Sequence, residues 1–313
     1  SFTSLLFFLS LHDALPISVV PWISFSMEKS FVSTLLGIAL DEGRIASVEE
    51  PITDYLPELV GSGYEGARIK DILQMSSGAS WNEDYSDFNS DINRLGRVFA
   101  LGGSLDEFIT TLTPDRPPGT YNRYNSADTQ VLGRLLVEAT GRSIADYMQE
   151  KLWDPLGAAQ PGYWMRDDLG MEMAFAGFNA TARDYARLGQ LYLQGGIWRG
   201  EQIVSREWVS ASVSPDAPHL LPGDNPASGN VLGYGYQWWV LDGDDSEFSA
   251  IGVYNQFIYV NPAQEVVIVK LSANSDYGTG SDESAYRELE TFSLFRAIVA
   301  ETIADRAGDQ GGP

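Results

Sequence analysis

Ser26 and Lys29 form the only Ser-x-x-Lys sequence in the chain, at the start of an apolar run. Three residues apart on a helix, a serine hydroxyl and a lysine amine lie on the same face. This spacing supplies a nucleophile with a base beside it, and the positive end of the helix dipole favours the neutral amine. Because serine is also a common helix N-cap and lysine is commonly solvated, the motif needs support from other segments.

The composition limits the chemistry that this chain can carry out. Its 313 residues are 44% hydrophobic, enough for one large core or a core with an inserted lobe. It contains no cysteine, which excludes thiol nucleophiles, disulfides and thiolate metal sites. With only His12 and His219 present, neither a Ser-His-Asp triad nor a histidine-rich zinc site is expected. The net charge of −23 argues against a nucleic-acid partner, because phosphate contacts need clustered Lys and Arg.

Residues 1–17 differ in character from the rest of the chain. They resemble the hydrophobic part of a signal peptide, but no basic segment or starting methionine precedes them. The stretch is too short and interrupted to span a bilayer. His12 to Ile17 reads like a translated sequencing adapter, so we expect an artefact, with early strands of the fold missing or imitated. The compartment is then unreadable, and a periplasmic and a cytoplasmic location both stay open, with the periplasm preferred.

Apolar periodicity and capping residues predict a helical middle and a strand-rich end. Helices are expected at 27–42, from Ser47, and at 68–75, 91–100, 104–112, 127–140, 143–153, 181–194, 205–213 and 283–303. Strands are expected at 235–241, 248–253, 255–260 and 266–271. The pattern predicts an α+β fold in which an antiparallel sheet is flanked by helices and an all-helical lobe, about 65–200, is inserted. We expect one domain over 18–304 and a disordered tail over 305–313, with the active site between sheet and lobe.

Several short segments, in a fixed order, resemble one enzyme superfamily. They are Ser26-Met27-Glu28-Lys29, Asp54-Tyr55-Leu56-Pro57, Leu73 to Gly78, Pro118-Gly119-Thr120, Tyr124-Asn125-Ser126, Thr181 to Ala186, and Gly252 to Gln256. Together they resemble the serine β-lactamase and penicillin-binding superfamily with its β-lactamase/transpeptidase-like fold. The likeness is to its class C-related branch of esterases and 6-aminohexanoate-dimer hydrolases. Each segment alone is weak, whereas the ordered combination over roughly 21–304 is specific.

The resemblance implies a role for each matching residue. Ser26 is expected to be the nucleophile, Lys29 its base, and Tyr124 a phenol that relays the proton to the leaving group. The backbone N–H groups of Ser26 and Val253 are expected to form the oxyanion hole. Gly252 would let the backbone approach the substrate closely. Substrate contacts are also expected from Ser126, Tyr85 and Tyr254.

Two departures from the family pattern bear on specificity. The usual Lys-Thr/Ser-Gly is here Ala250-Ile251-Gly252, which lacks the charge that grips a β-lactam carboxylate. Ser126 replaces the asparagine of the Tyr-x-Asn motif, and no carboxylate is placed by the sequence to activate a deacylating water. The loop around Trp81, Asn82, Glu83 and Tyr85 is expected to line or cover the cleft, with a merely exposed loop as the alternative. Trp238 and Trp239 are expected to pack in the core.

The expected activity is hydrolysis of a small-molecule ester or amide through an acyl-enzyme on Ser26. A D-amino-acid peptidase and a weak β-lactamase are variants of the same chemistry. A binding module that kept the fold and lost turnover is the alternative of another class. No cofactor or metal is expected, because side chains alone can perform the proton transfers. No membrane span is expected, and the oligomeric state is not indicated.

Overall fold

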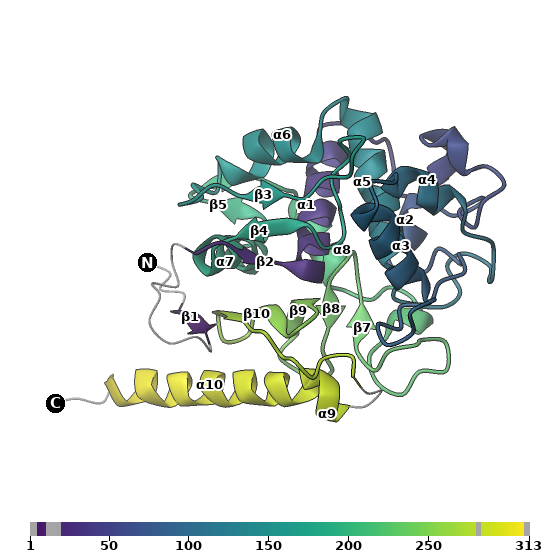
Figure 1. The fold of residues 1–313 in the computed structure, drawn as a ribbon. Helices are drawn as coiled ribbons and strands as arrows, with labels where there is room; N and C mark the ends of the chain where they lie inside the picture. Colours follow the sequence, from purple (N-terminus) through teal and green to yellow (C-terminus); the bar gives the residue numbers. More distant parts are fainter. Residues whose placement is uncertain (1–4, 11–19, 280–282, 310–313) are drawn as a thin grey trace.

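A computed structural model describes residues 5–10, 20–279 and 283–309 (Figure 1). Their largest sheet has six strands in the order β1-β11-β10-β9-β8-β7. The pairs are antiparallel except for β1 and β11, which run parallel. The strands are β1 (Leu5–Ser10), β7 (Gly233–Tyr234), β8 (Trp239–Val240), β9 (Phe248–Gly252), β10 (Gln256–Asn261) and β11 (Val266–Leu271).

Alternate residues of the sheet pack against helices on its two faces, as strand geometry requires. Phe257 and Tyr259 of β10 contact Phe292 and Phe295 of α10 (Glu288–Asp309). Ile258 and its neighbours on the other face join the main core, which includes α7 (Ala182–Leu193). Figure 1 shows α9 and α10 on one side of the sheet and the other labelled helices on the opposite side.

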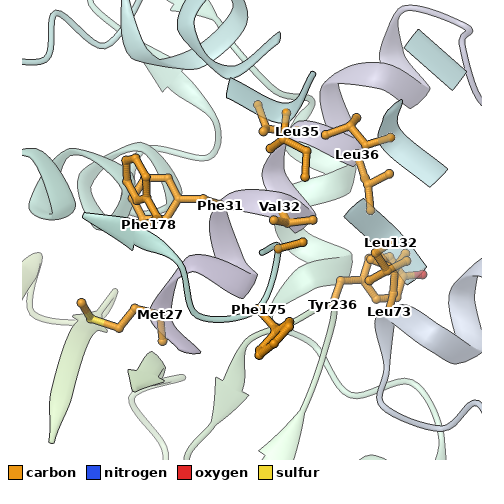
Figure 2. Packing of buried hydrophobic residues seen from close by; sticks show 14 of the residues in the cluster. Met27, Phe31, Val32, Leu35, Leu36, Leu73, Leu132, Phe175, Phe178 and Tyr236 are labelled. Carbon is orange, nitrogen blue, oxygen red and sulfur yellow. The ribbon is translucent and has the colours of Figure 1, made fainter. Parts of the chain in front are cut away.

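The helix that follows the Ser-x-x-Lys motif, α1 (Glu28–Asp41), is buried on every side from Glu28 to Ala39. The sequence predicted one buried face, but the sheet and the surrounding helices enclose α1 completely. Its polar residues are accommodated by hydrogen bonds: Ser30 Oγ donates to the carbonyl of Gln237, and Ser33 Oγ to that of Tyr236. Figure 2 shows apolar side chains packed on several sides of this helix.

The inserted region combines helices with a small sheet. Its helices are α2 (Ile69–Leu73), α3 (Asp91–Ala100), α4 (Leu105–Thr110), α5 (Ser126–Thr140) and α6 (Ile144–Met148), which continues as a π-helical turn over Gln149–Trp153. The strands β2 (Trp22–Ile23), β4 (Phe178–Ala180) and β3 (Tyr163–Trp164) pair in that order. The region 65–200 is therefore not purely helical, and its boundaries stay a prediction.

The other elements are short. They are the hairpin β5 (Ile197–Trp198) and β6 (Glu201–Gln202), α8 (Arg206–Ser212), α9 (Glu283–Tyr286), and the 3₁₀ turns Phe25–Met27, Ile52–Asp54, Pro57–Leu59 and Pro218–Leu220. None of the described helices is long and apolar enough to cross a membrane.

Four predicted elements differ from the structure. Of the strand expected at 235–241, only β8 forms, because Gln237 before it has a φ of 62°, which is outside the range of a strand. The helix expected from Ser47 begins only at Ile52, because Pro51 is held in an extended conformation. The closing helix is divided into α9 and α10 at Arg287, whose φ of 54° is incompatible with a continuous right-handed helix. Residues 305–309, expected to be disordered, continue α10; the helix-forming types at 304, 306 and 307 favour this. Most of 1–17, as well as 310–313, lies outside the described residues.

Candidate active site

Ser26 and Lys29 meet at the point where a 3₁₀ turn passes into α1. The Nζ atom of Lys29 lies 3.2 Å from Oγ of Ser26. Ser26 is 7% exposed and Lys29 only 2%. Phe25, directly before Ser26, has a φ of 46°, a left-handed conformation that is rare for an aromatic residue. Its ring packs edge-on against Tyr254, which also has a positive φ, so both strained residues lie beside the serine.

The amine of Lys29 contacts two further oxygens. Its Nζ donates to Oγ of Ser126 at 3.1 Å and to the carbonyl of Phe175 at 2.9 Å. Burial lowers the pKa of Lys29 from 10.5 to about 8, because a charged ammonium is poorly solvated there. The negative charges of Glu83, Glu28 and Asp128 act against this lowering. A substantial fraction of Lys29 is therefore neutral at pH 8 and able to accept a proton.

Tyr124 lies directly before α5, with its ring on one side of the Lys29 amine. The Nζ atom of Lys29 is 5.2 Å from the ring centroid. The ring of Trp239 stacks on the ring of Tyr124, with the two centroids 5.2 Å apart and the ring planes at 21°. Burial raises the pKa of Tyr124 well above 10, and a hydrogen bond with Ser26 acts in the opposite direction. The phenol consequently keeps its proton at neutral pH and can act as a donor.

Ser126 connects Lys29 to a carboxylate, and its contact with a substrate stays a prediction. It is buried at the first residue of α5, and Asn125 caps that helix through bonds to the N–H groups of Ala127 and Asp128. Oγ of Ser126 donates to Oε1 of Glu83 at 2.7 Å, and its backbone N–H donates to Oε2 at 3.1 Å. This carboxylate was one of four loop residues that the sequence could not rank.

Gly252 brings the end of β9 against the backbone at Ser26. A Cβ atom there would overlap the carbonyl oxygen of Ser24 and lie 3.2 Å from the nitrogen of Ser26. This close approach is between two segments of the protein. The approach of the Gly252 backbone to a substrate stays a prediction, and Gly252 lines the cavity at Ser26. Val253 follows in the β9–β10 turn and lines the same cavity as Ser26. Its role as an oxyanion donor stays a prediction.

Two cavities meet at Ser26. The larger, about 550 Å³, is lined by Tyr124, Trp239 and Gly252 together with residues from the C-terminal segment. The smaller, about 170 Å³, is lined by Phe25, Ser126, Phe175 and Tyr254 and by neighbouring apolar groups. Tyr85, Val253 and Tyr277 border both cavities. A substrate with a group on each side of its carbonyl can therefore be accommodated across Ser26.

The sequence missed part of the cavity wall. Trp239 was expected in the core, but only Trp238 is fully buried, because adjacent strand residues point to opposite faces. Trp81, expected to line or cover the cleft, belongs to the core, and its indole N–H donates to Glu83. Four residues after β11 were not singled out: Tyr277, Glu283, Tyr286 and Glu288. Their only sequence signal was a polar, tyrosine-containing segment.

The site combines a hydroxyl nucleophile, an amine of lowered pKa and a protonated phenol. These are the groups that acyl transfer requires, provided that donors for the oxyanion are added. Among the described residues, no three His, Asp or Glu side chains converge as metal ligands would.

Comparison with known proteins gives consistent matches over most of the chain. The Beta-lactamase family model matches residues 21–291. The chain is 33% identical over 262 residues to a 6-aminohexanoate-dimer hydrolase of Paenarthrobacter ureafaciens, covering 81% of this chain and 66% of that relative. A solved structure from Bacillus anthracis, a candidate 6-aminohexanoate-dimer hydrolase, superimposes with a TM-score of 0.79 at 24% identity, covering 94% of this chain and 76% of that one. A family VIII carboxylesterase has a TM-score of 0.59 at 16% identity, with 78% and 74% covered.

Proposed function

Because this chain belongs to the beta-lactamase family, we propose that it is a serine hydrolase that cleaves small esters or amides through an acyl-enzyme on Ser26. The observation that carries the proposal is the buried contact between Ser26 and Lys29, 3.2 Å apart, beside a cavity. A serine that served only as a helix cap would not need a buried amine of lowered pKa beside it.

In acylation, neutral Lys29 takes the proton of Ser26 while Oγ attacks the substrate carbonyl. The N–H groups of Ser26 and Val253 receive the developing oxyanion, and Tyr124 donates its proton to the leaving alcohol or amine. The ammonium of Lys29 then gives its proton to the Tyr124 oxygen, which restores both groups. In deacylation, neutral Lys29 takes a proton from the water that attacks the acyl-Ser26 carbonyl, and Oγ of Ser26 receives this proton as the acid leaves. Replacing Tyr124 by Phe should lower kcat by at least about 100-fold with little change in KM.

Amides belong in the proposed substrate range because a relative at 33% identity is named as a 6-aminohexanoate-dimer hydrolase. A β-lactam is a less suitable substrate, since the buried side chain at Ala250 offers no positive charge to its carboxylate. D-amino-acid peptides share this disadvantage, because their terminal carboxylate lies next to the scissile bond, whereas that of the 6-aminohexanoate dimer is separated from the amide by a flexible methylene chain.

The test is steady-state hydrolysis of p-nitrophenyl butyrate and of 6-aminohexanoate dimer by the wild type and the Ser26→Ala variant. Turnover that is lost in Ser26→Ala supports the proposal, and the ratio of the two substrates separates esterase from amidase. Turnover that persists in the variant contradicts the assignment of Ser26. If the folded wild type binds both substrates but hydrolyses neither, the result supports the binding-module alternative.

A further inference from the structure

The carboxylate of Glu83 is surrounded by hydrogen-bond donors. Its Oε1 accepts from Oγ of Ser126 at 2.7 Å and from the hydroxyl of Tyr85 at 2.8 Å. Its Oε2 accepts from the backbone N–H of Ser126 at 3.1 Å and from the indole N–H of Trp81. Four donors converge on one group that only accepts, so the direction of each bond is fixed.

This fixed direction determines how the Ser126 hydroxyl meets Lys29. A hydroxyl has one proton, and that of Ser126 is committed to a charged acceptor, which gives the stronger type of hydrogen bond. Ser126 can therefore only accept from Lys29, at 3.1 Å. If Ser126 were free to rotate, it could instead donate its proton to the lone pair of neutral Lys29.

The neutral amine then has one arrangement. It carries two protons and one lone pair, and it has three oxygen neighbours: Ser126, the carbonyl of Phe175 at 2.9 Å, and Ser26 at 3.2 Å. The carbonyl can only accept, and Ser126 is held as an acceptor, so both amine protons are used. The lone pair is left facing the hydroxyl of Ser26, which is the orientation required of its base.

We propose that Glu83 is a positioning residue that, by holding the Ser126 hydroxyl as a donor, directs the lone pair of Lys29 toward Ser26. The inference rests on the proposed function, because it assigns a role within the same proton transfer. Glu83 also acts through its charge. The ionisable groups that face Lys29 are Glu83 from the loop before α3, Glu28 from α1, Asp128 from α5 and the phenol of Tyr124. Of the carboxylates, Glu83 has the largest effect on Lys29.

The experiment is a double-mutant cycle of Glu83→Gln and Ser126→Ala, with kcat/KM measured across pH. An amide has one accepting oxygen, so it cannot satisfy four donors, and the Ser126 hydroxyl is released. Glu83→Gln alone should lower the high-pH plateau of kcat/KM by at least about tenfold. In the Ser126→Ala background the same change should leave the plateau within about twofold, because no hydroxyl remains to be misdirected. Asp84→Asn, which removes an exposed carboxylate from the same loop, is the matched control and should leave the plateau unchanged.

A second measurement follows the charge effect independently of turnover. The chain has four lysines, so NMR of lysine labelled with ¹³C at Cε can report the titration of Lys29, identified by its absence from Lys29→Arg. The pKa of Lys29 should fall in Glu83→Gln and stay unchanged in Asp84→Asn. Equal plateau losses in both Ser126 backgrounds would overturn the positioning role, as would an unaltered plateau. If Glu83→Gln lowers the pKa of Lys29 but the protein turns over no substrate, the proposed function is wrong, whereas the effect of Glu83 on Lys29 is supported.

Discussion

At the scale of single residues, the protonation states of two side chains carry the chemistry. Burial lowers the pKa of Lys29 to about 8 and raises the pKa of Tyr124 well above 10, because both shifts favour the neutral form of the group. A neutral amine accepts a proton and a neutral phenol donates one. The pair therefore supplies a base and an acid at the same pH without a histidine.

The pH dependence of the reaction should report the titration of Lys29. The proposed mechanism requires its neutral form, and its pKa is about 8, so kcat/KM should rise about tenfold per pH unit below pH 8 and level off above it. The measurement is kcat/KM for a neutral ester between about pH 6 and pH 10, where the ester itself does not ionise. A profile that is flat through pH 7 would exclude Lys29 as the titrating base.

At the scale of elements, α1 and β9 hold the reacting residues against each other. The sequence was sufficient to predict α1 and the strands β9 to β11 within a few residues, because each has strong apolar patterning and clear turn residues. It could not predict which residues of a loop touch Lys29. Glu83 is positioned by Trp81 and by the start of α5, more than 40 residues away, and no local pattern encodes such a contact.

The contact between β9 and the turn at Ser26 should not tolerate a side chain. In Gly252→Ala the new methyl group would meet the backbone at Ser24 and Ser26, and neither can move without displacing the Ser26 N–H. We expect kcat to fall by about 100-fold or more, the effect of losing one oxyanion donor. The control is Gly96→Ala on α3, where a Cβ meets nothing within 4 Å. Normal activity in Gly252→Ala would contradict the tight contact.

The complete burial of α1 makes its apolar residues important for stability. The Phe31 ring packs against Phe178, with centroids 5.3 Å apart (Figure 2). It also packs against Tyr185 and Trp153. Phe31→Ala should lower the free energy of unfolding by about 3–5 kcal/mol, since the enclosed helix leaves little room for the cavity to collapse. Urea denaturation followed by circular dichroism measures this change. Leu101→Ala, at a position that is 85% exposed, should change it by less than about 0.5 kcal/mol.

At the scale of the whole molecule, negative charge dominates both the surface and the larger cavity. The net charge is −23, and Glu83, Glu283 and Glu288 line the cavity at Ser26. Burial raises the pKa of Glu288 to about 7, so this residue gains its negative charge as pH rises through neutrality. The composition indicates the acidity but not its location, because the tertiary structure, and no local sequence pattern, brings Glu283 and Glu288 to the site.

Anionic substrates should therefore be disfavoured. At pH 8 and low salt, kcat/KM for the anionic β-lactam nitrocefin should be at least about 100-fold below that for neutral p-nitrophenyl butyrate. Raising the ionic strength from about 0.05 M to about 0.5 M should increase the nitrocefin value and leave the ester value nearly constant, because salt screens the repulsion. Identical salt responses of the two substrates would contradict an electrostatic origin.

Distant parts of the chain contribute to this site, so the site can be complete only after the last of these parts has been synthesised. Ser26 is synthesised before Val253, and the wall formed by Tyr277, Tyr286 and Glu288 follows both. Chains are made from the N-terminus, so the serine and its lysine spend most of translation without the strand beside them. We therefore expect a nascent chain that ends before β9 to be inactive, because the strand end and the C-terminal wall of the cavity have not yet been made.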